Sequence, residues 1–400
     1  MLLLIDGFPI LSADGGEIKH DVVPMFDVEK IEVLKGAGSA LYGSSALGGV
    51  VNVITAKPRS NDLRLRMFSG FYDKTKYAEW NWWGTSPRWF NAAYGRIQRV
   101  YGSSSFRVSG GVYGNQGYRK MDDFLRWNVT ASGWLKLAKD HRLHVSANVA
   151  SNHRGNWIFW RSLKHPLVPP ENADLSERVV SEKQYVYAKH SWLVNSFFSM
   201  ENRLYLYHTS NDTKSDTSDF SLRPADRVQS SAYVAGYQWQ GIYSGIKGHL
   251  LTGGMDASFS YVDAQTFGRR TATSWALYLQ DEVSLFSGMR LTVGARGDYT
   301  KVDIAKVDGR INPRLGMAYD IAPGSTMRAS VGLGFRSPSI AERFAVAGAA
   351  GLQTKPNPDL LPERSTSYEI GFRQVIFPFA VVDVALFRND YRDLVEPIID

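Results

Sequence analysis

From Leu63 onward, apolar and polar residues alternate along the chain with a period of two. Between Met327 and Arg336, for example, Met, Ala, Val, Leu and Phe take turns with Arg, Ser, Gly, Gly and Arg. A period of two places successive side chains on opposite faces of a β-strand. About 15 such segments can be counted. The pattern therefore predicts a mainly β chain, in which each strand has one face in an apolar medium and the other in water.

The connections between the expected strands alternate between short and long. This alternation places short turns on one rim of a sheet and long loops on the other, which is typical of an outer-membrane barrel. The short connections are expected at 138–140, 200–201, 244–245, 287–288, 322–325 and 377–379, and the long ones at 153–183, 212–227 and 337–365.

A membrane barrel and a soluble sandwich both give one apolar face to every strand. The barrel is favoured because the strands are many for one soluble sheet, because the connections are asymmetric, and because charged residues on the polar faces suit a hydrated lumen. No stretch approaches the roughly 18 apolar residues of a membrane helix. We expect a transmembrane antiparallel β-barrel, with a soluble β-sandwich or β-repeat protein as the alternative.

Composition excludes several classes of function. The net charge is +7, but Lys and Arg are dispersed without a dense run, so we expect a mixed-charge surface with contacts to anionic lipid and no nucleic-acid groove. The chain has no cysteine, which excludes disulfides and thiol chemistry. Its 11 Trp and 20 Tyr recur near strand ends, as an interfacial aromatic girdle requires.

The segment from Val28 to Pro58 differs from the rest of the chain, because it joins two short apolar runs through a stretch rich in Gly, Ser and Ala. Glycine permits tight turns and close backbone approach, which suits a small domain packed inside a barrel. Two enzyme motifs are incomplete here. Leu41 stands where a dinucleotide fingerprint needs its third Gly, and residues 43–47 lack the second Gly of a nucleophile elbow.

This segment and the chain's first residues resemble the plug domain of TonB-dependent outer-membrane receptors, with Ala37 where the family commonly has Pro. The matching runs are DGFP at 6–9, IEVLKG at 31–36, LYGSSALGG at 41–49 and NVIT at 52–55. Downstream, FRSP at 335–338 and NPDL at 357–360 resemble two boxes of the same family's barrel. The resemblance implies a structural role for Asp6, Gly7, Gly36, Gly38, Tyr42, Gly43, Gly48 and Gly49.

The resemblance implies that residues 1–58 are the C-terminal part of a plug and that residues 59–400 are a barrel incomplete at its C-terminus, with about 15 of an expected 22 strands. We read the sequence as a fragment at both ends. The coupling box for the TonB energy-transducing complex would lie upstream, so we expect the chain as given not to transport.

The resemblance also implies a location in the bacterial outer membrane, in contact with its lipid and lipopolysaccharide. We expect a monomer with no cofactor, no metal site and no enzymatic activity.

The resemblance implies active import of a scarce, bulky nutrient. We rank a ferric siderophore first and cobalamin second, with haem or a carbohydrate behind. Haem ranks lower because the resemblance implies a His between the two barrel boxes in haem receptors, and no His lies between Phe335 and Asn357. A passive channel and a barrel enzyme such as a lipase or protease remain as alternatives. Candidate ligand contacts are Asp14 and Glu17 after the DGFPI run, Trp157, Trp160 and Arg161 in a long loop, and Arg336 and Glu342 beside another.

Overall fold

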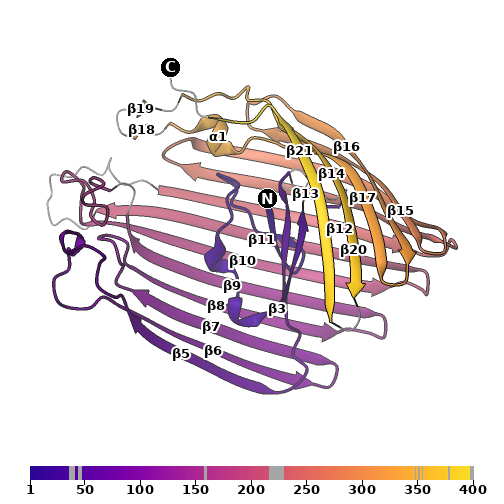
Figure 1. The fold of residues 1–400 in the computed structure, drawn as a ribbon, viewed down its shortest axis with the longest axis horizontal. Coiled ribbons are helices and arrows are strands. Elements are labelled where there is room, and N and C mark those ends of the chain that lie inside the picture. The colour runs from indigo at the N-terminus through magenta and orange to yellow at the C-terminus, as the bar shows by residue number, and fades with distance from the viewer. Residues whose placement is uncertain are drawn as a thin grey trace.

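Fifteen antiparallel strands form one continuous curved sheet, which confirms the expected number and pairing of the strands. Each strand pairs with its neighbour along the chain, from β5 at one edge to β21 at the other, and the sheet is not closed within the described residues (Figure 1). The computed structural model describes residues 1–35, 41–43, 47–156, 160–215, 229–346, 348–349, 352–353, 355–376 and 379–396.

The strands are long enough to cross a bilayer at a tilt. They are β5 (Asp62–Phe71), β6 (Trp89–Tyr101), β7 (Ser104–Asn115), β8 (Phe124–Lys136), β9 (His141–Gly155), β10 (Glu177–Leu193), β11 (Phe198–Ser215), β12 (Gln229–Tyr243), β13 (His249–Ala264), β14 (Gly268–Phe286), β15 (Met289–Val302), β16 (Asp308–Ala322), β17 (Ser325–Arg336), β20 (Glu363–Ile376) and β21 (Ala380–Arg392).

The apolar faces of these strands point away from the protein. On β14, Leu277 and Leu279 are 69% and 60% exposed, whereas Tyr278 and Gln280, which alternate with them, are buried on the concave side. Arg296 and Thr300 of β15 are likewise buried on that side. A soluble sandwich would bury the leucines and expose the polar residues. The sheet therefore has a lipid-facing exterior and a polar interior, as a membrane barrel requires.

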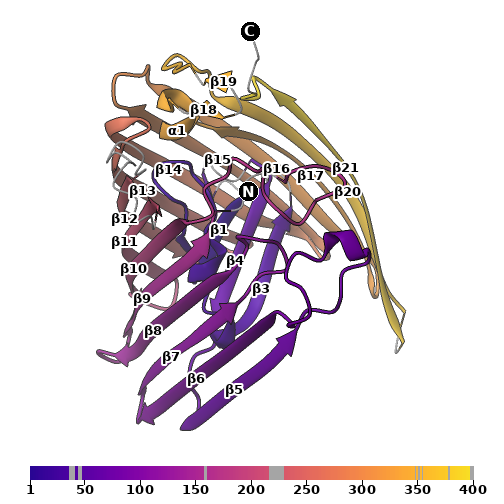
Figure 2. The same ribbon diagram turned by 90° about the vertical axis from the view of Figure 1, so that its left-hand side faces the viewer.

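A second, four-stranded sheet lies in the hollow of the large one (Figures 1 and 2). Its strand order is β2-β1-β4-β3, and β1 pairs parallel with β4 while its other pairs are antiparallel. The strands are β1 (Leu2–Ile5), β2 (Phe8–Pro9), β3 (Val28–Lys35) and β4 (Gly49–Thr55).

The small sheet packs directly on the inner wall of the large one. Ile5, Phe8 and Val22 share one buried cluster with the wall residues Tyr185 and Tyr187. The rings of Phe8 and Tyr187 are stacked with their centroids 4.0 Å apart. The small sheet therefore fills part of the bore and is held there by apolar burial.

The short connections share one rim. On the opposite rim lie 72–88, 116–123, the described parts of 156–176 and 337–362, and the shorter 265–267 and 303–307. The long connection expected at 153–183 is shorter, because β9 continues to Gly155 and β10 begins at Glu177, and most of the one expected at 212–227 lies outside the described residues. The turn expected at 200–201 is wrong, because Met200 pairs within β11 and the chain turns at 194–197. Asn195 makes that turn, since its side-chain oxygen accepts hydrogen bonds from the backbone N–H groups of Phe197 and Phe198, both at 2.9 Å.

Helices are few and short. α1 (Ile340–Phe344) and the two-residue strands β18 (Gly348–Ala349) and β19 (Leu352–Gln353) belong to the loop between β17 and β20. Short 3₁₀ turns occur at His20–Val22, Met25–Asp27 and Ala78–Trp80. Across the residues that the structure describes, no helix has the length and apolar character to span a membrane.

Candidate functional site

The loop that follows β2 folds back on itself at the long-loop end of the bore. The Ser12 N–H donates to the Glu17 carbonyl at 3.2 Å, and the Gly16 N–H donates to the Ser12 carbonyl at 3.0 Å. Gly16 has φ of +64°, a conformation that glycine adopts at no steric cost. The Asp14 carboxylate accepts from the Gly15 N–H at 2.7 Å. These hydrogen bonds hold residues 11–19, which we call the plug loop, in a compact turn.

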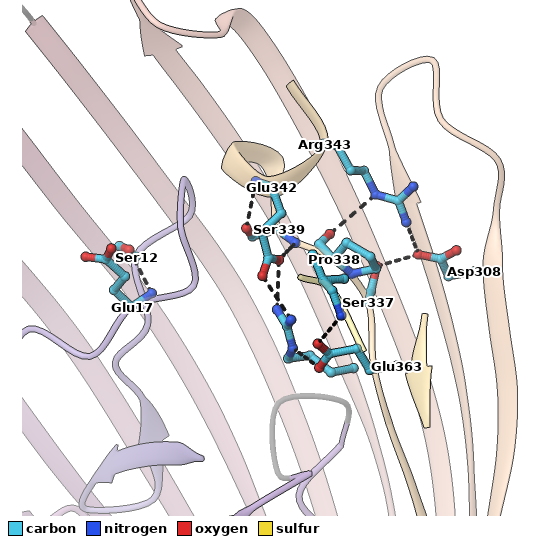
Figure 3. Close-up of polar contacts among 11 residues, drawn as sticks. Ser12, Glu17, Asp308, Ser337, Pro338, Ser339, Glu342, Arg343 and Glu363 are labelled. Carbon is cyan, nitrogen blue, oxygen red and sulfur yellow. Dashed lines mark hydrogen bonds and ion pairs between the residues drawn. The ribbon is translucent and has the colours of Figure 1, made fainter. Parts of the chain in front are cut away.

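Helix α1 faces the plug loop from the barrel wall and begins with a capping box. The Ser339 hydroxyl accepts from the Glu342 N–H at 3.2 Å, and the Glu342 carboxylate accepts from the Ser339 N–H at 2.7 Å. Figure 3 shows Glu342 beside Ser339 at the start of the helix. This reciprocal pair satisfies two backbone donors that a helix start leaves free.

Arg336, the last residue of β17, holds α1 against the wall. Its Nη1 and Nη2 donate to the two oxygens of Glu342 at 2.8 and 2.9 Å, and its Nε donates to Glu363 at 2.6 Å. Burial alone would raise the pKa of Glu342, but the hydrogen bonds from Arg336 and Ser339 outweigh it and hold that pKa below its ordinary value. The carboxylate is therefore charged at neutral pH.

A second arginine on the other side of the helix is almost fully buried. Arg343 donates to the Asp308 carboxylate at 2.6 Å and to the Pro358 carbonyl at 2.6 Å. Figure 3 shows the Arg343 and Asp308 side chains pointing toward each other. Neither residue was among the candidates expected from the sequence. The only sequence signal is that Arg343 is the single cation between two apolar helix residues, Ile340 and Phe344, that are buried beside it.

The loop helix and the plug loop touch directly. The Ala341 N–H donates to the Asp14 carbonyl at 2.9 Å. Ile340 and Phe344 bury their side chains in a cluster with wall residues, and Ala13 of the plug loop packs against that cluster. The structure thus brings the predicted residues Asp14, Arg336 and Glu342 close together. The contacts that join them are made within the protein and involve no ligand. Glu17 instead pairs with Lys19 at the surface.

A cavity of about 690 Å³ lies between the plug domain and the wall below this junction. Arg296 crosses its floor, bonded to Asp256 at 2.7 Å and Asp298 at 2.8 Å, and its Nη1 donates to the Leu41 carbonyl at 3.4 Å. Arg203 reaches the same space and pairs with Glu201 at 2.5 Å. The cavity therefore has a polar floor with fixed cations and a roof formed by the plug loop and the start of α1.

The predicted aromatic residues lie elsewhere. Trp157 is outside the described residues. Trp160 is exposed, and Arg161 pairs with Glu171 at 3.4 Å and donates to the Pro169 carbonyl at 3.4 Å. Among the described residues, neither Trp160 nor Arg161 lines the cavity. Their role as ligand contacts stays a prediction.

The motif residues of the plug hold its turns. Asp6, at φ of +52°, accepts from the Thr55 N–H and hydroxyl, both at 2.8 Å, and from the Tyr187 hydroxyl at 2.5 Å. The Gly7 N–H donates to the Asn52 side chain at 3.1 Å. The remaining described members, Tyr42, Gly43, Gly48 and Gly49, flank the cavity or open β4, whereas Gly36 and Gly38 lie outside the described residues.

Two protein-family models match the two parts of the chain. The family model described as TonB dependent receptor-like, beta-barrel, matches residues 182–400. The model described as TonB-dependent Receptor Plug Domain matches residues 1–50.

Individual relatives match nearly the whole chain. The iron-regulated outer membrane virulence protein of Vibrio cholerae is 25% identical, over 98% of this chain and 58% of the relative. The vitamin B12 transporter BtuB of Vibrio vulnificus is 26% identical, over 99% and 59%. The chain thus spans a little under three fifths of the length of these relatives. The crystal structure of the siderophore receptor PirA from Pseudomonas aeruginosa has the same fold, with a TM-score of 0.76 at 20% identity, covering 98% of this chain and 66% of that one.

Proposed function

The chain belongs to the TonB-dependent receptor family, and on this premise we propose that it serves the active import of a scarce, bulky nutrient across the bacterial outer membrane, most suitably a ferric siderophore. Residues 1–58 act as part of the plug and residues 59–400 as the barrel. The receptor works as a monomer, draws energy from the TonB complex and catalyses no reaction. The observation that carries the proposal is that the plug sheet packs inside the barrel and leaves a polar cavity between the plug loop and the lumen wall.

The cavity suits a ligand that arrives already chelated. Its floor offers cations fixed by neighbouring carboxylates, and cations held in this way can recognise anionic or polar oxygens without a large entropy cost. Two relatives point the same way, because one is named iron-regulated and another a siderophore receptor. In the proposal, Asp14, Glu17, Arg336 and Glu342 frame the entrance, and Trp157, Trp160 and Arg161 make a first contact from the long loop.

Cobalamin is the second candidate, because curated relatives of similar identity are named vitamin B12 transporters. A deletion strain separates the two ligands. In the deletion strain we measure uptake of iron-55 bound to a siderophore and uptake of cobalt-57 cyanocobalamin. Each is measured with and without the restored gene, and in the presence and absence of TonB. The proposal expects restored, TonB-dependent iron uptake. Restored cobalt uptake alone selects cobalamin, and uptake that persists without TonB makes the protein a passive channel and overturns the proposal.

A further inference from the structure

Three side chains of the barrel wall, Tyr113, Phe124 and Arg126, form a group that shares no residue with the cavity beneath α1. We call these three residues the Arg126 patch. Tyr113 lies near the end of β7 and pairs directly with Arg126 near the start of β8. The connection between these two strands, 116–123, belongs to the rim that carries the long loops. The patch therefore lies at the outer mouth of the bore.

The Arg126 patch faces the bore and not the lipid. On β7, Ser109 donates to Asp27 of the plug domain, and Tyr113 lies four residues further along the same strand, on the same face. Arg126 is the direct cross-strand partner of Tyr113, and directly opposed residues lie on one face of a sheet. Phe124 precedes Arg126 by two residues and shares that face. A molecule that enters the bore from outside therefore meets all three side chains.

Arg126 is held by aromatic rings and not by an acid. Its Cζ lies 4.8 Å from the ring centroid of Tyr113 and 5.0 Å from that of Phe124. The two rings meet edge to face, with their centroids 5.1 Å apart. Within the described part of the chain, Arg126 forms no ion pair with a carboxylate. Cation–π contacts position the guanidinium but leave its positive charge without a negative partner.

The arginines of the cavity beneath α1 differ in this respect. Arg296 pairs with two aspartates, and Arg203 pairs with Glu201. Arg336 at the roof pairs with two glutamates. An anion that approaches any of these arginines competes with a carboxylate already in place, whereas Arg126 offers its N–H donors without such a competitor. A negatively charged part of a ligand is therefore bound more favourably at Arg126.

Further rings continue from the patch toward the plug. Phe68 lies 5.9 Å from Tyr113, measured between ring centroids. Tyr94 follows at 6.3 Å from Phe68, and Phe26 of the plug domain at 6.3 Å from Tyr94. At the rim, a recess of about 550 Å³ reaches the same face at Phe124. The inner wall thus offers room for a planar group at the mouth and aromatic contacts from there to the plug.

We propose that the Arg126 patch binds a negatively charged oxygen group carried on an aromatic ring of the imported ligand. The guanidinium supplies paired N–H donors for such oxygens, and Tyr113 and Phe124 supply ring faces and edges for the ring that bears them. An aliphatic chelate without negative charge meets neither requirement. This inference rests on the proposed import of a ferric siderophore, and it narrows that ligand to anionic chelates with aromatic rings.

The test measures binding separately from transport. Outer membranes are prepared from a deletion strain that lacks TonB and expresses the full protein or a variant. They are titrated with iron-55 bound to a tris-catecholate siderophore, which is anionic and aromatic, or to an aliphatic trihydroxamate siderophore. Arg126→Gln removes the charge, and Tyr113→Leu removes a ring. Arg142→Gln is the control, because Arg142 is exposed at the opposite end of the wall, near the start of β9. Heat-modifiability on gels checks that each variant has folded.

We expect Arg126→Gln to bind the tris-catecholate complex at least about tenfold more weakly, as the loss of charge-assisted hydrogen bonds predicts. Tyr113→Leu should bind it about threefold more weakly, through the loss of an aromatic contact, and Arg142→Gln should bind it as the parent does. The trihydroxamate complex should bind the parent more weakly, and no variant should change that binding.

Unchanged binding of the tris-catecholate complex in Arg126→Gln, or equal weakening of both complexes, would overturn this inference. Uptake in a strain with TonB separates it from the proposed function. TonB-dependent uptake of the trihydroxamate complex alone, at the same rate in the parent and in Arg126→Gln, removes the Arg126 patch but leaves siderophore import standing. A parent that neither binds nor imports either iron complex removes both.

Discussion

At the scale of single residues, Gly43 occupies a position where a side chain has no room. Its φ is +61°, and a Cβ built there would lie 2.7 Å from Nη2 of Arg296. Gly43→Ala therefore forces Arg296 away from its two carboxylates, in addition to a backbone cost of about 1–2 kcal/mol. We expect a clear fall in the urea concentration at which the plug becomes sensitive to pulse proteolysis.

Gly102→Ala is the matched control for this substitution. Gly102 has φ of +57° in a tight turn, and a Cβ there would meet no atom within 4 Å. It therefore carries the backbone cost without the clash. If both variants lose the same stability, the contact between Gly43 and Arg296 has no energetic role.

Glu342 makes the docking of α1 dependent on pH. Its pKa is lowered in the folded loop, so the carboxylate stabilises the docked loop at every pH above the ordinary glutamate value of about 4.3, and this contribution disappears as the pH falls through the lowered value. We expect hydrogen-exchange protection of the Ala341 N–H, corrected for intrinsic exchange, to decrease below about pH 4. Glu342→Gln should show less protection at neutral pH and no such step.

At the scale of elements, a buried ion pair joins the plug to the wall. Asp27, at the end of the second 3₁₀ turn, lies 3.2 Å from Nε of Arg107 on β7, and both side chains are almost fully buried. The Arg107 guanidinium also donates to the Ala56 carbonyl at the end of the plug. Removing one partner of such a pair leaves an uncompensated charge, which costs about 3–5 kcal/mol.

Asp27→Asn should therefore loosen the plug without unfolding the barrel. We expect faster protease cleavage within the plug and greater entry of bulky antibiotics into cells that carry the variant. Glu32→Gln is the control, because Glu32 pairs with Lys30 at an exposed site and such pairs contribute about 0–1 kcal/mol. A plug as resistant in Asp27→Asn as in Glu32→Gln would contradict the anchoring role.

At the scale of the whole molecule, the outward face of the sheet is a surface for lipid. Leu277 lies in the middle of β14 and is largely exposed. Leu277→Arg would place a charge in hydrocarbon at a cost of about 2–4 kcal/mol. Leu163, even more exposed in the loop 156–176, should accept the same change almost without cost. The free energy of unfolding from liposomes measures both, and equal tolerance would mean that β14 does not face lipid.

The sequence predicts the wall well because period-two alternation is a local property that lipid and lumen impose on each strand separately. It places the turn before β11 wrongly, although alternation continues across Met200, because the turn signal at Asn195 is a single residue. The contacts of the candidate site are harder to predict from the sequence. Arg336 and Glu342 are six residues apart and were expected near one loop, but their link to Glu363 and the burial of Arg343 against Asp308 depend on strands distant in the chain.

Arg336 pairs with both Glu342 and Glu363, and this limits which ligand groups could replace either carboxylate. An incoming anion that takes the guanidinium from Glu342 and Glu363 uncovers two negative charges beside itself, and Coulomb repulsion then opposes the exchange. A ligand group that leaves both pairs intact meets no such repulsion. The three charges therefore act as a fixed clamp that ties the end of β17 to α1 and to the start of β20.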